Sequence, residues 1–381
     1  MKILSIETSC DETAVAVTEG RKILGSSVYS QILLHKKWGG VVPSIAKKAH
    51  QERIDFVIAE ALSKAVKGNF RGPVKSFPPI SARYRSGDLR AVRSPSTLAT
   101  PKIISTLINQ IDYIAVTYGP GLAIALEVGV EKAKELSRKY NKKIIPVNHM
   151  EGHIYASFAQ NSKGNPKRPF MFPYLGLLVS GGHTEIILWE DHLKFKLLGA
   201  TVDDAAGEAL DKAAKMLNLG YPGGPVIERI ASKVENRDIF KFSRPMRRSK
   251  NLNLSFSGLK TALYYLLKDN NEDFKIKEIN DIASSFQEAV FDSIILKTRR
   301  AIEMTGVKNI AVGGGVVANK RLRNLLRSLV KEFKGEIIFP PQKYLCTDNA
   351  AMIGVAAHYK AQAGIFVKNF KTFDREPKLS L

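Results

Sequence analysis

The 381-residue sequence has only two cysteines, Cys10 and Cys346, which lie far apart and form no Cys-x-x-Cys pair. A disulfide-stapled fold is therefore excluded, and a reducing compartment is expected. Long apolar runs are also missing. The most apolar stretch, Tyr113–Val130, is interrupted by Gly119-Pro120-Gly121 and carries Glu127, whereas a membrane helix needs about 20 apolar residues without such a break.

No secretory or transit signal is visible at the N-terminus. The first ten residues, MKILSIETSC, contain only about four apolar residues in a row, fewer than the ~7–15 of a secretory signal core. We therefore expect a cytoplasmic protein that does not bind membranes.

Acidic residues are few compared with basic ones: 36 Asp and Glu stand against 58 Lys and Arg, which gives a net charge of +22. Such a surface attracts polyanions, of which nucleic acid is the commonest. A heat-adapted or simply soluble surface would show the same excess. The basic residues cluster in Lys241–Lys250 (KFSRPMRRSK), which contains no acid, and in a second group with helical spacing that also fits an ordinary solvated helix face: Lys320, Arg321, Arg323, Arg327 and Lys331.

Apolar patterning predicts strands and helices in two successive series. The first series comprises strands at Lys2–Ile6, Ala14–Thr18, Ile23–Tyr29, Tyr113–Thr117 and Lys143–Val147 and helices at Ile45–Val66 and Glu127–Tyr140. The second comprises strands at Tyr174–Ser180, Thr184–Trp189, Phe195–Leu198, Asn309–Val312 and Glu336–Phe339 and helices at Asp204–Leu217 and Asn319–Lys334, with further helices between these two. A last helix is predicted at Asp348–Ala363. Three strands followed by alternating helices and strands thus occur twice.

This repetition predicts an α/β protein of two similar lobes with a nucleotide cleft between them. We expect an N-terminal lobe over residues 1–147, a second lobe over 148–340, and a C-terminal helix and tail over 341–381 that return to the first lobe. The hinge zone is predicted within Val147–Pro173.

Residues 69–101 differ in composition from the rest of the chain. They carry five prolines and several arginines with little apolar periodicity, which predicts a long loop or a disordered insert. Two interpretations stay open, a solvated insertion and an arginine-rich arm that contacts RNA.

The segment His149-Met150-Glu151-Gly152-His153 places two imidazoles on one face of a helix. About one chain in ten with this many histidines would contain such a pair by chance. The metalloprotease motif H-E-x-x-H requires its Glu directly after the first His, and Glu151 comes one position too late. A metal site is therefore favoured over a protease site.

A metal bound by two histidines needs a third ligand, and Asp348 is a candidate. An Asp at the start of a helix also serves as an N-cap, so both interpretations of Asp348 stay open. Three protein ligands would leave positions for substrate, as in catalytic sites.

Glycine-rich or hydroxyl-rich turns follow three of the predicted strands: Ile6–Asp11, Leu178–Thr184 and Val312–Gly315. Such turns can present backbone N–H groups to anions, although each alone also fits an ordinary tight turn. Together they indicate a bound nucleotide, and the absence of G-x-x-x-x-G-K-[ST] excludes a P-loop enzyme.

The sequence resembles the universal tRNA threonylcarbamoyladenosine family, TsaD in bacteria, over nearly its whole length. The segments that carry the resemblance are IETSCDET, GGVVPSIA, GPGL, HMEGH, LVSGGHT, DDAAGEALDKAAKML, YPGGP, SFSGLKTA, GGGVVANKRLR and CTDNAAMIG. HMEGH and SFSGLKTA are closer to the bacterial and mitochondrial branch than to the archaeal one. Two departures are the insert at 69–101 and Ile124, where many relatives have glycine.

The resemblance implies the two-lobed fold of actin, Hsp70 and sugar kinases. It also implies transfer of the threonylcarbamoyl group from threonylcarbamoyl-AMP to N6 of adenosine 37, in tRNAs that read codons beginning with A. One divalent metal ion would be bound, Fe²⁺ or alternatively Zn²⁺, by His149, His153 and Asp348. The adenylate would be held by Leu178, Val179, Ser180, Gly181, Gly182, Asp211, Gly224 and Asn319, and Asp11 would lie near the reacting centre.

The resemblance further implies partners besides tRNA, namely a paralogous subunit and a small ATPase as in bacterial relatives. The sequence leaves three alternative functions open. One is an ATPase or small-molecule kinase of the same fold, another is a metallopeptidase, and the third is a binding scaffold without catalytic activity.

Overall fold

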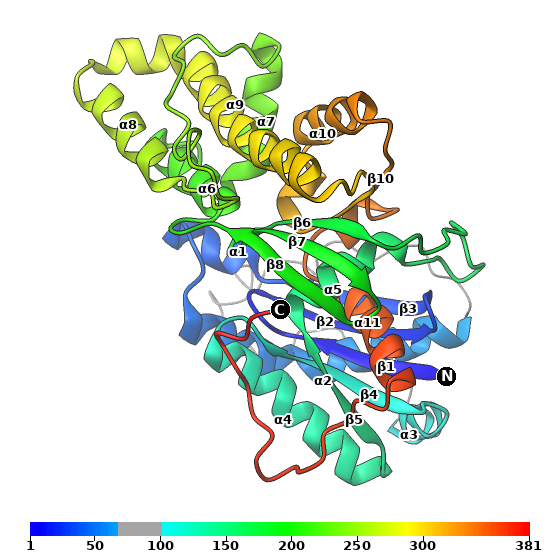
Figure 1. The fold of residues 1–381 in the computed structure, drawn as a ribbon. Helices are drawn as coiled ribbons and strands as arrows, with labels where there is room; N and C mark the ends of the chain where they lie inside the picture. Colours follow the sequence, from blue (N-terminus) through cyan, green and yellow to red (C-terminus); the bar gives the residue numbers. More distant parts are fainter. Residues whose placement is uncertain (68–100) are drawn as a thin grey trace, which may run out of the picture. The chain divides into compact units, whose positions relative to one another are not determined.

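The computed structural model describes residues 1–67 and 101–381, with side chains over 1–66 and 104–381, and these residues form two compact units (Figure 1). Unit 1 comprises Met1–Pro169 and Pro340–Leu381, and unit 2 comprises Phe170–Phe339. The sequence predicts divisions after residues 147 and 340, whereas these units divide after Pro169 and Phe339. The predicted insert lies outside the described residues except for Pro101, at which helix α3 begins.

Unit 1 contains one five-stranded sheet with helices on both faces. Its elements are β1 (Lys2–Glu7), β2 (Glu12–Glu19), β3 (Lys22–Ser30), α1 (Ile32–His35), η1 (Lys36–Trp38), α2 (Pro43–Lys67), α3 (Pro101–Asn109), β4 (Tyr113–Gly119), α4 (Ala123–Tyr140), β5 (Lys143–Asn148), α5 (His149–Tyr155), η3 (Ala156–Phe158), η6 (Lys343–Leu345) and α11 (Ala350–Gln362). The strand order is β3-β2-β1-β4-β5. β1 is antiparallel to β2 and parallel to β4.

The two faces of this sheet are set by the alternation of side chains along β1. Leu4 and Ile6 belong to the apolar cluster that includes Ala61 and Leu62 of α2. Ser5 points the other way, and its hydroxyl donates a hydrogen bond to the carbonyl of Ala350 at the start of α11. Because successive strand side chains alternate between faces, α2 and α11 cover opposite faces of the sheet.

Unit 2 repeats this plan with different helices. Its elements are β6 (Tyr174–Val179), β7 (Thr184–Asp191), β8 (Lys194–Ala200), α6 (Ala206–Met216), α7 (Gly223–Ala231), η4 (Ser232–Val234), α8 (Ser257–Lys268), α9 (Glu272–Thr305), β9 (Ile310–Gly313), η5 (Gly315–Ala318), α10 (Lys320–Glu332) and β10 (Ile337–Ile338). The strand order is β10-β9-β6-β7-β8. β6 is antiparallel to β7 and parallel to β9.

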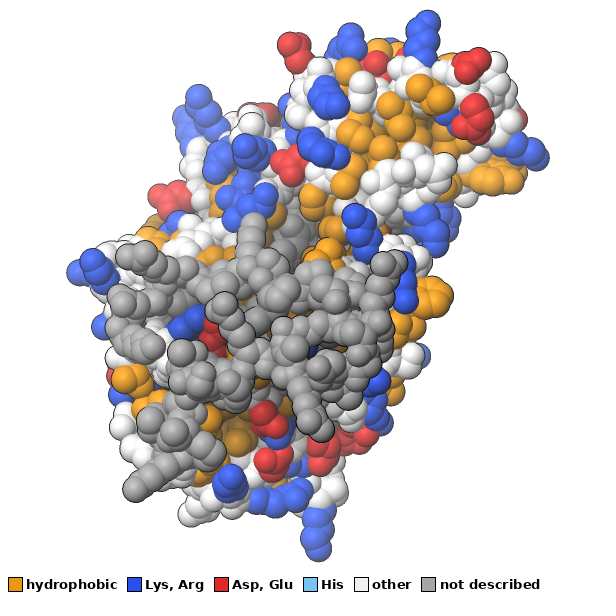
Figure 2. Space-filling view, turned by 180° about the vertical axis from the view of Figure 1, so that it is seen from behind, with side chains coloured by type: hydrophobic (Ala, Val, Ile, Leu, Met, Phe, Trp, Pro, Cys, Tyr) orange, Lys and Arg blue, Asp and Glu red, His pale blue; other side chains and the backbone are white. Residues whose placement is uncertain are grey.

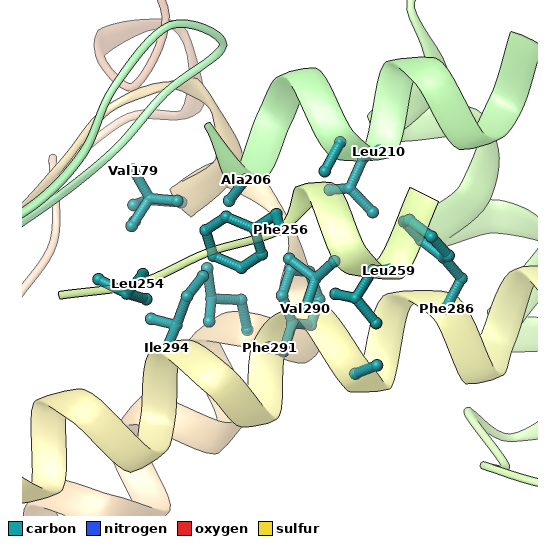
Figure 3. Close-up of a cluster of buried hydrophobic side chains, with 14 of the residues drawn as sticks. Val179, Ala206, Leu210, Leu254, Phe256, Leu259, Phe286, Val290, Phe291 and Ile294 are labelled. Carbon is teal, nitrogen blue, oxygen red and sulfur yellow. The ribbon is translucent and has the colours of Figure 1, made fainter. Parts of the chain in front are cut away.

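The core of unit 2 lies between its sheet and helices α6, α8 and α9. Figure 3 shows the ring of Phe256 among side chains from these elements, with Val179 and Ala206 on one side and Phe291 and Ile294 of α9 on the other. Phe256 is completely buried, and burying a side chain of this size stabilises the fold by roughly 1.5–3 kcal/mol. The core therefore fixes the segment that precedes α8.

The matching strand order confirms the prediction of two similar α/β lobes. In each unit the first strand pairs antiparallel with the second and parallel with the fourth, so both sheets are mixed. The largest difference from the predicted elements is α9, which runs for 34 residues without a predicted start or end. Within the described residues, no helix has the length and apolar character that crossing a membrane requires.

Candidate active site and metal centre

The two histidines of the HMEGH segment lie on α5, which begins directly after β5. Asn148 caps this helix, since its side-chain oxygen accepts a hydrogen bond from the Met150 amide at 2.8 Å. The cap starts the helix at His149, so His149 and His153 lie one turn apart with ring centroids 4.6 Å from each other. Both rings are buried.

Asp348 reaches these histidines from the segment before α11. Its Oδ1 lies 3.4 Å from Nε2 of His149 and 3.2 Å from Nε2 of His153. One ligand atom from each of the three residues falls within 4.8 Å of the others. The N-cap of α11 is Asn349, whose side chain accepts from the Met352 amide at 2.9 Å. The N-cap interpretation of Asp348 is therefore wrong, and its carboxylate is free for the cluster.

Glu7 stands behind His149 and was not predicted from the sequence. It is fully buried at the end of β1. Its Oε1 accepts from the Ser9 amide at 2.6 Å, and its Oε2 accepts from the Thr117 hydroxyl. The same Oε2 lies 3.1 Å from Nδ1 of His149. The Glu7 carboxylate therefore contacts Nδ1 of His149, while Nε2 faces Asp348. In metal sites, a carboxylate commonly binds the ring nitrogen of a histidine that does not bind the metal.

The charged groups of the cluster shift one another's pKa values. Burial favours a neutral His149, but the carboxylates of Glu7 and Asp348 outweigh this effect and raise the pKa of His149 to about 10. Burial disfavours the charged carboxyl of Asp348, yet His149 and His153 hold its pKa well below the usual range. Burial and the neighbouring His149 lower the pKa of His153. The surroundings therefore favour positive charge between the two carboxylates.

The residues present fit a divalent transition metal. Nδ1 of the buried His153 has no hydrogen-bond partner among the described residues, and its Nε2 faces Oδ1 of Asp348 at 3.2 Å without hydrogen-bond geometry, whereas buried polar atoms are normally satisfied. A metal ion bound at Nε2 would satisfy one of these nitrogens. Two imidazoles and one carboxylate with open positions are a donor set that suits Fe²⁺ or Zn²⁺.

Glu151 lies on the same helix but takes no part in this cluster. Its Oε2 forms an ion pair with Nζ of Lys360 at 2.7 Å. A metalloprotease needs its general base at the metal, so the position of Glu151 argues against the metallopeptidase alternative.

Asp11 lies in the turn between β1 and β2 and is buried. It is not among the three clustered ligand residues. Its neighbour Glu12 was not singled out from the sequence. Burial, and after it the charges of Asp11 and Asp348, raise the pKa of Glu12 well above its usual range. Glu12 therefore holds its proton more tightly than an ordinary carboxyl group does.

The predicted adenylate residues of the LVSGGHT segment lie at the end of β6. Leu178 and Val179 are buried in the strand, so only their backbone could meet a ligand. Ser180 closes a tight turn: its amide donates to the carbonyl of His183 at 2.8 Å, and its hydroxyl accepts from the His183 amide at 3.0 Å. Gly181 and Gly182 are exposed, and a Cβ added to either would meet no atom within 4 Å. Their backbone is therefore open to a ligand.

Asp211 and Gly224 are brought together where α6 meets α7. Oδ1 of Asp211 accepts from the amides of Gly223 at 2.7 Å and Gly224 at 3.2 Å. α6 itself starts against the glycine turn, because the Gly207 amide donates to the carbonyl of Ser180 at 3.2 Å. Helix α6 therefore connects the glycine turn, which meets its first residues, with Gly224, which contacts Asp211 in the same helix.

Asn319 begins α10. Its side-chain oxygen accepts from the amides of Arg321 at 2.8 Å and Leu322 at 3.2 Å, and its Nδ2 donates to Gln287 at 3.0 Å. The preceding Gly313–Gly315 turn packs against the end of β6: a Cβ on Gly314 would lie 2.3 Å from the carbonyl oxygen of Val179. Asn319 is thus held near the same end of the sheet.

Most of the chain matches one known protein family. The family model for tRNA N6-adenosine threonylcarbamoyltransferase matches residues 22–68 and 102–355. The chain belongs to the tRNA N6-adenosine threonylcarbamoyltransferase family. It is therefore a transferase that modifies adenosine in tRNA. The unmatched residues between the two ranges coincide with the predicted insert.

Curated tRNA N6-adenosine threonylcarbamoyltransferases are similar over their full length. The protein from Kosmotoga olearia is 44% identical over 366 residues, which cover 96% of this chain and 95% of that one. The protein from Thermotoga neapolitana is 39% identical and both chains are covered completely. The Staphylococcus aureus protein is 41% identical over 96% of this chain and 93% of its own.

Solved structures share the fold at low identity. HypF from T. kodakarensis superposes with a TM-score of 0.55 at 14% identity, covering 97% of this chain and 48% of HypF. A second HypF structure, with phosphate and nucleotide bound, gives a TM-score of 0.51 at 11% identity over 95% of this chain and 46% of that one. The chain thus spans about half the length of HypF.

Proposed function

We propose that this transferase forms N6-threonylcarbamoyladenosine at position 37 of tRNAs that read codons beginning with A, with threonylcarbamoyl-AMP as donor. The single observation that carries the metal-dependent form of this reaction is the cluster of His149, His153 and Asp348, in which neither ring nitrogen of the buried His153 makes a hydrogen bond of normal geometry to a described residue. Family membership supports the reaction class, and the open backbone at Gly181 and Gly182 supports an anionic donor.

His149, His153 and Asp348 would hold the metal, Fe²⁺ in our proposal and Zn²⁺ as the alternative. When bound, such an ion supplies Lewis-acid polarisation of a substrate carbonyl and orients the threonyl group. The chain contributes the orientation of the ligands: Glu7 holds His149 by Nδ1, and Asn148 fixes the start of the helix that carries both histidines. The protein would thereby present all three ligands before the substrate arrives.

The donor would be held in unit 2. The amides of Gly181 and Gly182 would donate to the phosphate oxygens of the adenylate, while Asp211, Gly224 and Asn319 would bind its nucleoside part. Such backbone donors also stabilise the leaving phosphate, because they are positioned before charge develops on it.

The bond changes follow from an acyl transfer. Adenine N6 is a weak nucleophile, so it requires an activated acyl donor. A bond forms between N6 and the carbamoyl carbon, the bond from that carbon to the phosphate oxygen breaks, and AMP leaves as the anion. Asp11 would accept the proton that N6 loses.

Bacterial relatives act with a paralogous subunit and a small ATPase, and we propose the same partners here. Because tRNAs read codons in the cytoplasm, we propose that compartment for the enzyme.

Mass spectrometry of nucleosides tests the proposal. An unmodified transcript of a tRNA that reads codons beginning with A is incubated with the protein, threonylcarbamoyl-AMP and either Fe²⁺ or Zn²⁺, with and without bacterial partner subunits. We expect threonylcarbamoyladenosine from the unsubstituted protein. Product should be lost in His153→Ala and retained in His358→Ala, which removes an imidazole outside the cluster.

Asp11→Asn separates catalysis from metal binding. We expect it to abolish transfer while the metal content stays that of the unsubstituted protein. Full activity in Asp11→Asn would remove Asp11 from the mechanism. If folded, metal-loaded protein gives no product under any condition, the proposed reaction is wrong and ATP turnover without tRNA is the next test.

A further inference from the structure

The loop of residues 241–253, here called the basic loop, presents cations that the chain does not neutralise. Arg247, Arg248 and Lys250 are exposed, and none of them forms an ion pair with any described acidic residue. On the face drawn in Figure 2, basic side chains are scattered with acidic ones among them. The basic loop differs from that mixture because the segment Lys241–Lys250 contains no acid.

The three arginines of the second basic group, on α10, contact other side chains of unit 2. Arg321 forms an ion pair with Glu288. The guanidinium groups of Arg323 and Arg327 lie over the ring of Phe339, 4.8 Å and 5.0 Å from its centroid, where the interaction of a cation with an aromatic face is favourable. The exposed cations of the basic loop have no such role in the fold.

The basic loop is nevertheless held in a defined shape by α9. Nζ of Lys297 is buried beneath the loop and donates to Ser249 Oγ at 2.7 Å, to the Ser249 carbonyl at 3.3 Å and to the Asn251 carbonyl at 2.7 Å. The guanidinium of Arg300 also donates to the carbonyl of Ser249. These bonds turn the loop carbonyls inward, toward two cations of the helix.

Arg244 secures the other end of the loop. Its Nη2 lies 2.6 Å from Oδ2 of Asp238 and 2.6 Å from Oδ2 of Asp292 on α9. The inner cations, Arg244, Lys297 and Arg300, therefore hold the loop, while the outer ones stay in solvent. Placing five or more cations together costs electrostatic repulsion, which a polyanion bound outside would relieve.

The basic loop ends beside the glycine turn of the same unit. The Leu254 amide donates to the carbonyl of Ala200 at 3.0 Å, and the Val202 amide donates to the carbonyl of Leu254 at 2.9 Å. Ala200 ends β8 at the sheet end where β6 ends and β7 begins, because Ala200 pairs with Glu185 and Thr184 with Val179. Figure 3 shows Leu254 and Phe256 inserted into the core directly after the loop.

We propose that the basic loop binds the phosphodiester backbone of the tRNA substrate through Arg247, Arg248 and Lys250. This inference rests on the proposed function, since it places the RNA beside the turn that would hold the acyl donor. RNA is favoured over an acidic protein partner because three adjacent exposed cations without apolar or acidic side chains among them match a repeating phosphate charge.

The salt dependence of tRNA binding tests this proposal. The triple variant Arg247→Gln, Arg248→Gln and Lys250→Gln removes three charges and keeps polar side chains. Its matched control, Lys194→Gln, Lys308→Gln and Lys331→Gln, removes three exposed charges of unit 2 from the opposite end of the sheet. The probe is an unmodified transcript of a tRNA that reads codons beginning with A, and binding is measured at several salt concentrations.

Each phosphate contact contributes about 0.7–0.9 to the slope of log K against log salt. We expect the loop variant to lower this slope by about 2 to 3 and to weaken low-salt binding about tenfold or more. The control should retain the slope of the unsubstituted protein, and melting temperatures should agree among all three. Equal slopes in the two triple variants would overturn the proposal, whether or not the loop then binds an acidic protein.

A nucleoside assay distinguishes failure of this inference from failure of the proposed function. If threonylcarbamoyladenosine forms normally in the loop variant even at limiting tRNA, the basic loop is not the RNA contact, while the proposed reaction stands. If neither the unsubstituted protein nor either triple variant forms the nucleoside, but the salt slopes differ as expected, the proposed reaction is wrong and the proposed RNA contact stands.

Discussion

Nδ1 of His149 lies 3.1 Å from Oε2 of Glu7, and Nε2 of the same ring lies 3.4 Å from Oδ1 of Asp348. The ring is thus held between two carboxylates that reach it from distant parts of the chain. Glu7 is in turn fixed by the Ser9 amide and the Thr117 hydroxyl. The position of His149 therefore depends on the end of β1 as much as on its own helix.

Glu7→Gln should weaken metal binding without removing a ligand. The amide keeps the size of the side chain but loses the charge that orients the imidazole, and loss of such a partner typically costs 10–100-fold in metal affinity. Competition titration of Zn²⁺ against a chelating dye measures this effect. Glu151→Gln, on the same helix but paired with Lys360, should bind Zn²⁺ as the unsubstituted protein does. Equal affinity in Glu7→Gln would show that Glu7 has no part in the site.

Two neighbouring glycines should respond differently to the same substitution. A Cβ on Gly223 would lie 2.5 Å from the Cβ of Ala214 and 2.7 Å from the Cα of Asp211, while one on Gly224 would meet nothing within 4 Å. Gly223→Ala should therefore destabilise the protein by about 1–3 kcal/mol, the usual range for overpacking. Gly224→Ala should leave the melting temperature unchanged.

Gly224→Ala then tests the donor site directly. If the adenylate binds beside Gly224, the added methyl group should raise the KM for threonylcarbamoyl-AMP in the nucleoside assay. An unchanged KM would place the donor elsewhere in unit 2.

Lys297→Met should destabilise unit 2. Lys297 is 2% exposed and donates to three oxygen atoms of the basic loop. Methionine fills similar space but removes the donor to Ser249 Oγ and to the Asn251 carbonyl, while the Ser249 carbonyl keeps Arg300, so we expect a cost of about 2–4 kcal/mol. Chemical unfolding measures the loss. Lys331→Met, at an exposed position of α10, is the control, and a matching free energy of unfolding in the two variants would contradict the proposed anchoring.

Asp203 should make stability depend on pH in the acid range. Partial burial acts to raise its pKa, but hydrogen bonds from the hydroxyls of Ser255 and Ser257 and from the Phe256 amide lower it below the ordinary value of 3.8. Its stabilisation is therefore fully present above pH 3.8 and is lost as the pH falls through the lowered value.

Asp203→Asn should remove this dependence. We expect its free energy of unfolding to be lower than that of the unsubstituted protein at neutral pH by about 0.5–1 kcal/mol, because the amide still accepts hydrogen bonds but lacks the charge that strengthens them. The difference should shrink as the pH falls from about 5 to about 2. Asp191→Asn, at an exposed position, is the control. A difference that stays constant over this range would mean that the charge of Asp203 does not stabilise the start of α8.

The sequence predicted the sheets well because their strands are short apolar runs between turns. It missed the first residues of α4, which begins at Ala123 where a start near Glu127 was expected. Leu122 precedes this helix and provides no side-chain cap, so the usual Ser, Thr, Asp or Asn signal was absent. The ends of α9 were not predicted. Its central part is buried on several faces, and polar residues such as Ser284, Ser285 and Gln287 occupy some of them, so apolar periodicity alone does not reveal the whole helix.

The site was predictable only where its residues form a recognisable pattern. His149 and His153 are four residues apart, and Asp348 followed from the resemblance. Glu7 gave no signal, because a single carboxylate in an apolar strand forms no spaced motif, and its partners Thr117 and His149 are more than a hundred residues away in the sequence. The choice between N-cap and ligand for Asp348 required the structure, which shows Asn349 in the capping position.

The shared strand order places two chemically different turns at equivalent positions. The turn between β1 and β2 occupies the same topological place as the turn between β6 and β7. The first turn carries the carboxylate of Asp11, while the second carries Gly181 and Gly182, which have no side chains and an exposed backbone. One topological position therefore offers a negative charge in unit 1 and open backbone amides in unit 2. Exchange of the two turns would be expected to exchange these properties while leaving each sheet intact.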